Sequence, residues 1–303
     1  MVALLGASTV ISSRTEEKLD KKALEIVQRT IAAYGGEASV YLLRQRGQLR
    51  GFVKAYMEDG STREGEITIR FLHRLEKQDE LRQVELRFPN APTLVITYDG
   101  ERVWGTENGA PIVLRLRTEA AFRAELKHNY EALLRYREYK AEVKYVGREK
   151  RSGLEVDVLD LVRPDGSTTR YFISARTFRI LHLEYDVTVP LVNRPIRFRD
   201  SFYDFRVVQT TLVPYRLERY EDGRLVQEIR FTEVAYGVQI EESQFRPPGS
   251  RGRPASARMN RLTSCAPRLP RCAEAVRPVR RAARAEAPAG HRTGPLRADD
   301  APR

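Results

Sequence analysis

The stretch that decides the fold runs from Leu81 to Trp104 and reads LRQVELRFPNAPTLVITYDGERVW. Its first part alternates polar residues with apolar ones, the period-two pattern of a strand with one buried face; the apolar members are Val84, Leu86 and Phe88. Two prolines within residues 89–92 interrupt this strand, because proline lacks the N–H that a sheet needs. A second run follows, and Asp99-Gly100 then predicts a hairpin with a type I′ turn. We therefore expect an antiparallel sheet here.

Similar alternation extends on both sides of this stretch. A long run from Leu42 to Met57 contains Gly47 and Gly51, which we expect to mark bends or bulges. The next run, 66–75, places three apolar side chains on one face: Ile67, Ile69 and Phe71. Further strand-like runs occupy residues 140–148, 154–162, 169–173, 180–187, 196–208, 212–220 and 225–236. About ten to eleven such runs, separated by turn signals, predict a large antiparallel sheet.

Two segments have the spacing of helices instead. Residues 19–34 carry one apolar stripe and end at Gly35-Gly36. A second helix is predicted from Thr118, as its N-cap, to about Arg135. Two helices are too few to cover both faces of a parallel sheet, so the fold class is α+β. We expect a curved antiparallel sheet that forms a half-closed β-barrel, covered by an N-terminal helix and a central helix acting as a lid.

The net charge of +12 over 303 residues is unevenly distributed. Residues 249–303 contain 13 Arg, no Lys and 4 acidic residues, so they carry +9 and leave +3 for residues 1–248. This tail is rich in Ala, Pro and Arg and has no aromatic residue, a composition that predicts disorder. A frameshift or read-through product of a GC-rich gene would have the same composition. A nucleic-acid role would depend on the tail alone.

The first residues, 1–13, are apolar and then small and polar, as in the end of a secretory signal peptide that lacks its basic start. A frayed apolar N-terminus is the alternative. Elsewhere the sequence contains no run of 18 apolar residues, so no transmembrane helix is predicted. The predicted organisation is therefore a truncated signal peptide at 1–13, one domain at 14–248 and a disordered tail at 249–303.

Motifs for catalysis are absent from the sequence. It has no G-x-S-x-G, P-loop, G-x-G-x-x-G or H-E-x-x-H pattern. Three histidines fall on different predicted elements, and we interpret each as an ordinary surface or sheet residue: His73, His128 and His182. Asp157 and Asp160 are expected to face solvent rather than to form an acid–base pair. The two cysteines, Cys265 and Cys272, do not have the spacing of a metal site. No cofactor, metal or enzymatic activity is predicted.

The order of these features resembles a known family. A helix that ends in Gly-Gly, then long strands, then Tyr98-Asp99-Gly100 followed by Trp104 is similar to the first half of the outer-membrane lipoprotein carrier and sorting superfamily (LolA/LolB-like). The closing strands add further similar motifs: Tyr203-Asp204-Phe205, Leu212-Val213-Pro214-Tyr215, Asp222-Gly223, Ile229 and Phe245-Arg246-Pro247-Pro248. The resemblance covers residues 18–248. It implies a half-barrel with a helical lid over an apolar cavity that holds acyl chains in the periplasm.

The resemblance also suggests site residues. The apolar cavity would be lined by inward strand residues and by aromatic or lid residues: Ile67, Ile69, Phe71, Val84, Leu86, Phe88, Trp104, Phe122 and Leu126. Each of these side chains would equally suit a filled core. In the carriers a strand arginine ties the sheet to the lid, and the candidates here are Arg44, Arg46 and Arg50. A solvated strand face is the other interpretation of these arginines.

These observations lead to one function and two rivals. The leading hypothesis is non-enzymatic binding and transport of lipid acyl chains or lipoproteins in the bacterial cell envelope, by an exported, periplasmic monomer. A membrane protein could be a further partner, and no nucleic acid is expected for the folded domain. The second hypothesis is a periplasmic sensor or protein-interaction module of the same fold. The third is an enzyme that acts on lipids, which the missing nucleophile motif disfavours.

Overall fold

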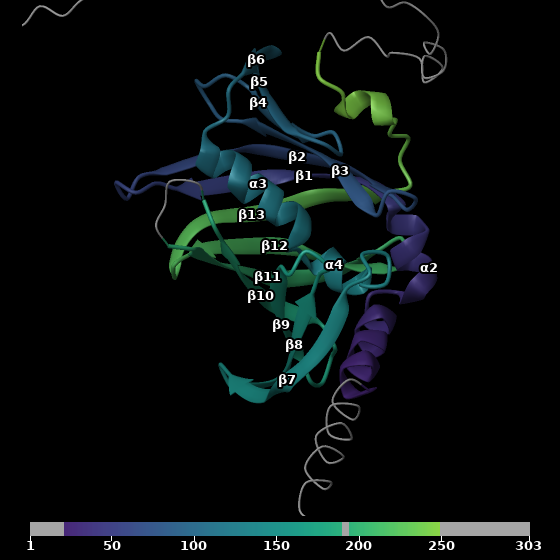
Figure 1. The fold of residues 1–303 in the computed structure, drawn as a ribbon. Helices are drawn as coiled ribbons and strands as arrows, with labels where there is room; N and C mark the ends of the chain where they lie inside the picture. Colours follow the sequence, from purple (N-terminus) through teal and green to yellow (C-terminus); the bar gives the residue numbers. More distant parts are fainter. Residues whose placement is uncertain (1–20, 190–193, 249–303) are drawn as a thin grey trace, which may run out of the picture. The chain divides into compact units, whose positions relative to one another are not determined.

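The computed structural model describes residues 21–189 and 194–248 (Figure 1). These residues form one antiparallel sheet of thirteen strands, ordered β6-β5-β4-β3-β2-β1-β13-β12-β11-β10-β9-β8-β7. The sheet is curved and unclosed, and helices cover its concave side, which confirms the predicted fold class. It exceeds the expected ten to eleven strands because short runs pair as well. The predicted signal peptide and tail lie outside the described residues.

The strands keep close to the predicted runs. The first half comprises β1 Arg46–Tyr56, β2 Thr62–Arg74, β3 Asp79–Arg87, β4 Leu94–Tyr98, β5 Val103–Glu107 and β6 Ala110–Ile112. The second half comprises β7 Glu142–Arg151, β8 Leu154–Val162, β9 Thr168–Ser174, β10 Ile180–Val187, β11 Ile196–Val208, β12 Thr211–Glu221 and β13 Arg224–Tyr236. The pairing of β1 with β13 shifts register at Gly51, so the predicted bulge is present there.

The connection between β6 and β7 positions the lid. These two strands follow one another in sequence, yet they form the opposite edges of the sheet. The chain between them must therefore cross a face of the sheet, and it does so as α3 (Leu116–Lys127) and α4 (Tyr130–Leu134). Figure 1 shows α3 running across the strands in the middle of the sheet. Its Glu125 contacts Arg82 of β3 and Arg219 of β12, which places α3 over the concave side.

The predicted central helix is two helices. The helical segment begins at Leu116 rather than after Thr118, and its N-cap residue Arg115 makes no side-chain cap. It breaks at Asn129, whose side chain accepts a hydrogen bond from Ala132 N at 3.0 Å and so caps α4. As the N-cap of α4, Asn129 has an extended backbone conformation, which a continuous helix cannot contain. The cap therefore explains the break. No helix among residues 21–189 and 194–248 is long and apolar enough to cross a membrane.

The N-terminal segment forms the predicted helix, which ends where the glycine pair begins. Residues 21–33 are helical, and Gly35 ends the helix with φ 104°. A Cβ at Gly35 would lie 2.4 Å from the carbonyl oxygen of Thr210, so only glycine fits. The long strand predicted from Leu42 starts later than expected, because α2 (Gly36–Tyr41) and the 3-10 turn η1 (Leu43–Gln45) precede it.

The largest apolar core lies where β7–β11 meet residues 21–33 and α4. Strand β8 is buried on both faces: Leu159 and Leu161 are 0% exposed, and Val156 and Val158 are buried in a second cluster. One prediction here is wrong. Asp157 does not face solvent but is 1% exposed, because Arg148 pairs with both of its oxygens at 2.9 and 3.0 Å.

The turn at Asp99-Gly100 forms a hairpin of a different type from the predicted one. Asp99 Oδ1 accepts hydrogen bonds from the backbone N–H groups of Glu101 and Arg102, both at 2.9 Å, so residues 99–102 form a longer loop. Positive φ at two successive residues, as a type I′ turn requires, occurs instead at Asn108-Gly109 between β5 and β6. The Asp99 side chain competes with the tighter turn.

Candidate functional site

A cavity of about 80 Å³ lies between the concave side of the sheet and the α3–α4 segment. This volume holds several water molecules or one small chemical group. Its walls come from β1, β2, β3, β11, β12 and β13 on one side and from residues 125–131 on the other. The crossing of the sheet by α3 and α4 therefore creates the enclosure.

One wall of the cavity is apolar, because inward positions of five strands carry apolar side chains. They are Leu49, Ile69, Phe71, Phe202, Pro214, Leu217, Phe231 and Tyr236. Ile69, Leu217 and Phe231 also pack against a neighbouring cluster around Val53, whose other partly buried members are Val84, Leu86 and Phe88. The apolar surface thus continues from the cavity along β2 and β3, where Val84, Leu86 and Phe88 are only partly buried.

The opposite end of the cavity is charged. Glu80 accepts a hydrogen bond from Arg82 Nε, and Arg82 Nη1 lies 3.3 Å from Glu125 Oε1. Glu125 Oε2 accepts from Arg219 Nη1 at 2.7 Å, and Arg219 donates two further bonds to Asp200, each of 2.8 Å. Although burial opposes its ionisation, Arg219 and Arg82 hold the pKa of Glu125 below its ordinary value. These five residues form one continuous chain of alternating charge.

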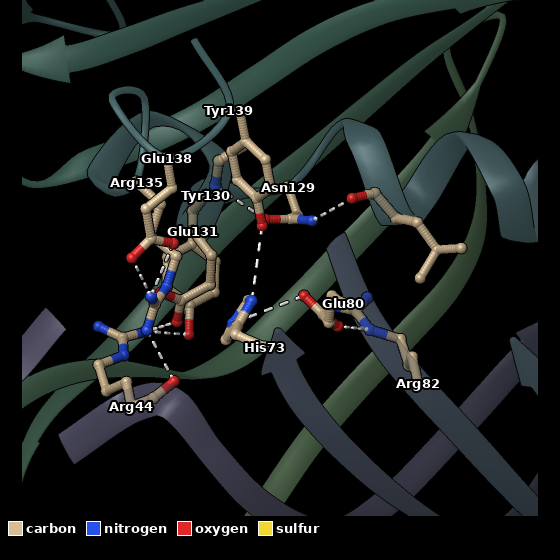
Figure 2. A network of polar contacts seen from close by, with 12 residues as sticks. Arg44, His73, Glu80, Arg82, Asn129, Tyr130, Glu131, Arg135, Glu138 and Tyr139 are labelled. Atoms are coloured by element: carbon tan, nitrogen blue, oxygen red, sulfur yellow. Dashed lines mark hydrogen bonds and ion pairs between the residues drawn. The ribbon is translucent and has the colours of Figure 1, made fainter. Parts of the chain in front are cut away.

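A second buried network fixes α4 to the start of β1 (Figure 2). Arg44 is 0% exposed, pairs with Glu131 and donates to the hydroxyl of Tyr130 at 2.8 Å. Arg135, also 0% exposed, donates to the carbonyl oxygen of Arg44 at 2.8 Å and pairs with Glu138 at 2.9 Å. Breaking a buried ion pair by removing one partner costs about 3–5 kcal/mol, so this network rigidly positions α4.

Between the two networks lies His73, which is 2% exposed (Figure 2). Its Nδ1 is 3.5 Å from the Tyr139 hydroxyl, and its Nε2 is 3.7 Å from Glu80 Oε2. Burial, together with the positive charges of Arg135, Arg82 and Arg44, lowers the pKa of His73 well below its ordinary value. His73 is therefore neutral near pH 7, and our interpretation of it as an ordinary sheet residue overlooked a buried polar position.

The structure brings some of the expected site residues together. Ile69 and Phe71 line the cavity, whereas Ile67, Val84, Leu86 and Phe88 belong to the adjoining cluster. Leu126 lines a separate pocket of about 430 Å³ beside α3. Trp104 lies elsewhere and donates its indole N–H to the carbonyl oxygen of Phe245 at 3.3 Å, and Phe122 is buried on α3.

The three candidate tethering arginines have different environments. Arg44 lies in η1 and reaches α4 through Tyr130 and Glu131. Arg50 is half exposed and pairs with Glu233 of β13 at 3.5 Å. The carbonyl oxygen of Arg46 accepts a hydrogen bond from the backbone of Gly237. Of the three, Arg44 is thus the arginine that connects the sheet to the α3–α4 segment.

Comparison with known proteins gives a fold but no close relative. No family model matches the sequence, and no curated protein matches it. A domain from Vibrio parahaemolyticus described as an outer membrane lipoprotein-sorting protein matches with TM-score 0.50 and 13% identity, over 75% of this chain and 97% of that one. A DUF1329 family protein from Desulfovibrio piger matches with TM-score 0.51 and 12% identity, over 74% and 97% of the two chains.

The fold is similar to that of this lipoprotein-sorting protein domain. The resemblance found in the sequence motifs is therefore confirmed at the level of the fold. A LolA superfamily protein from Nitrosomonas europaea also matches, with TM-score 0.49 and 11% identity, over 74% of this chain and 97% of that one. At these identities the likeness concerns the backbone, so the residues of the cavity have to be argued from this chain.

The sequence reasoning missed most of the charged residues that the fold encloses. The sequence contained a signal for them, because alternate residues of a strand lie on the same face of the sheet. In β2 His73 shares the face of Ile69 and Phe71, and in β3 Arg82 shares the face of Val84, directly opposite Phe71. In β11 and β12, Asp200 and Arg219 likewise lie two residues from inward-facing apolar residues. Each of them could have been identified as a charged or polar residue at the end of an otherwise apolar strand face.

Proposed function

We propose that this protein binds the acyl chain of a lipid or lipoprotein without catalysis and acts as a carrier in the bacterial cell envelope. The observation that carries this proposal is the apolar wall of the cavity, which continues into the half-buried cluster of Val84, Leu86 and Phe88. The lipoprotein-sorting fold supports it, because the same architecture places a helical segment over a curved sheet.

The proposal requires the cavity to widen. Its 80 Å³ admits a small group but not a long chain, so the N-terminal part of α3 must move away from the sheet to admit one, while Glu125 near the other end of α3 stays paired with Arg82 and Arg219. The two lid helices differ in a way that suits this movement: α3 buries only Phe122 and Ala124, whereas four of the five residues of α4 are buried. Each buried CH₂ of a ligand would contribute about 0.8 kcal/mol, which offsets the cost of opening.

Native mass spectrometry of the full chain, purified without detergent, tests the proposal. We expect adducts with masses of acyl lipids, and we expect Leu86→Asp to remove them, because a carboxylate in the apolar cluster opposes chain burial. The matched control is Leu154→Asp, since Leu154 lies on β8 and is already 53% exposed. It should keep the adducts.

Two outcomes would count against acyl-chain binding. One is a folded Leu86→Asp protein with unchanged adducts. The other is an unmodified protein that carries no lipid and ignores added fatty-acid probes. In the second case, co-purification of a defined protein partner would favour the protein-interaction role of the same fold.

A further inference from the structure

The charged end of the cavity carries an uncompensated negative charge. Its five-residue chain contains three carboxylates and two guanidinium groups, which occur in the order Glu80, Arg82, Glu125, Arg219, Asp200. Each arginine is already paired with two carboxylates. The neighbouring network of Arg44, Arg135, Glu131 and Glu138 is balanced and supplies no spare positive charge. One carboxylate of the chain therefore remains in excess in a buried environment.

The geometry locates this excess at Glu80 rather than at Asp200. Both oxygens of Asp200 accept hydrogen bonds from Arg219, a bidentate arrangement that requires the carboxylate form, although burial raises the pKa of Asp200. Glu80 uses only Oε1, for Arg82. Among the residues that the structure describes, Glu80 Oε2 has no hydrogen-bond partner, although Glu80 is 4% exposed and lines the cavity. An unpartnered buried carboxylate oxygen is costly.

His73 does not neutralise this charge. Its Nε2 is 3.7 Å from Glu80 Oε2 and has no hydrogen-bond partner within the described part of the chain. Burial and the three nearby arginines keep the ring neutral near pH 7. If Nδ1 carries the proton and donates it towards the Tyr139 hydroxyl, Nε2 is left as an acceptor that faces the cavity. Glu80 and His73 then present two free acceptors side by side.

We propose that this end of the cavity binds the ammonium head of a long-chain primary amine, whose alkyl chain follows the apolar wall. The inference rests on the proposed function, because it names the class of amphiphile that the same cavity takes. An ammonium group is compact, carries the missing positive charge and has three N–H donors. Glu80 Oε2 and His73 Nε2 accept two of them, because neither atom has a hydrogen-bond partner among the described residues and both residues line the cavity.

Other head groups fit this end less well. A carboxylate or phosphate would add a second negative charge beside the carboxylate of Glu80. Two neighbouring negative charges in a buried site repel each other strongly. Arg82 and Arg219 cannot turn towards it without leaving Glu125, Glu80 or Asp200 unpaired. A hydroxyl group supplies a donor but no charge, so it leaves the imbalance in place.

The experiment compares three probes of equal chain length on the full, unmodified protein: dodecylamine, dodecanol and dodecanoate. Dissociation constants are measured at pH 7 by calorimetry, below the concentration at which the probes self-associate. One ion pair is expected to make dodecylamine bind at least about tenfold more tightly than dodecanol, with dodecanoate weakest. This comparison tests the proposal whether or not a variant folds.

A matched pair of variants assigns the effect to the site. Glu80→Gln keeps an oxygen for Arg82 but removes the excess charge, so the amine preference should fall to about twofold or less while dodecanol binding stays. Glu85→Gln changes the same charge on the same strand, where Glu85 pairs with Arg70 and Arg87 away from the cavity, and should keep the preference. Dodecanol binding without an amine preference, or a preference that survives Glu80→Gln, would overturn the inference and leave the proposed function standing. Binding of none of the three probes would remove both.

Discussion

Two regions of the sheet have the same alternation of polar and apolar residues, but their apolar side chains are buried to different extents. In β7–β11 the inward side chains pack against residues 21–33 and α4, and several are 0% exposed, among them Leu159, Leu161, Tyr171, Ile173, Ile180 and Leu183. In β2 and β3 several of the corresponding positions are only partly buried, among them Ile69, Val84, Leu86 and Phe88, although Ile67 and Phe71 of β2 are buried. We call these the filled region and the cavity region.

The covering helix explains the difference. Residues 21–33 present a complete apolar stripe, in which Ala23, Ile26, Val27 and Ile31 are all buried. The α3 helix buries Phe122 and Ala124 and meets the sheet mainly through the charged side chain of Glu125. A narrow stripe on the helix therefore leaves room between it and an apolar strand face. Alternation in a strand predicts an inward face, and the facing element decides whether that face is filled.

The strongest test of this comparison removes the same atoms from both regions. Leu161→Ala in the filled region should lower the free energy of unfolding by about 3 kcal/mol, because a fully buried leucine leaves a cavity. Leu86→Ala in the cavity region should cost about 1 kcal/mol, since its side chain is only partly removed from water. Urea denaturation of both variants measures the two values. Equal losses would mean that the two regions are packed alike.

A second test uses His128, which lies where α3 ends against the filled region. Its ring stacks on Tyr185 at 4.5 Å, and its Nδ1 is 2.7 Å from Thr169 Oγ1. Burial, with the charges of Arg163 and Lys127, lowers the pKa of His128 to about 4. The unfolded chain therefore takes up the proton first, so stability is complete above about pH 6.5 and falls as the pH drops towards 4.

The expected size of this effect is about 2 kcal/mol between pH 7.5 and pH 5. His128→Asn removes the titrating group and keeps a polar atom near Thr169, so its free energy of unfolding should fall about 2 kcal/mol less than that of the unmodified protein over the same interval. Denaturation curves at the two pH values give the difference for each protein. If the free energies of unfolding of the two proteins change equally with pH, water reaches the ring of His128. His128 would then lie outside the filled region.

Much of the fold was predictable because it depends on local signals. Strand alternation, the glycines after residue 34 and the Asp-Gly or Asn-Gly turns gave most strands to within a few residues and the correct fold class. The spacing of Ile69 and Phe71 predicted that they share the inward face of a strand, and both line the cavity in the structure. These features depend only on the spacing of apolar residues and on the conformational preferences of individual residues.

The charged part of the site was not predicted, because it depends on contacts between distant strands. Glu125 on α3 meets Arg82 and Arg219, which are 43 and 94 residues away in sequence. Asp157 seemed solvent-facing until the structure placed Arg148 against it. Period-two reasoning assigns a charged residue to solvent unless its partner is known, and the partner is a property of register and topology.

The smallest expected effect concerns Asn129, which separates the loosely covered α3 from the firmly buried α4. Its Oδ1 accepts from Ala132 N at 3.0 Å, and its Nδ2 donates to the carbonyl oxygens of Glu125 and Leu126 at 3.0 and 3.2 Å. Asn129→Ala should cost about 1 kcal/mol, because the first turn of α4 loses its cap. Asn129→Asp keeps the accepting oxygen and loses the donors, so thermal denaturation should place it nearer to the unmodified protein. If both variants are equally destabilised, the bonds to α3 matter more than the cap, and the two helices are joined more tightly than their different burial indicates.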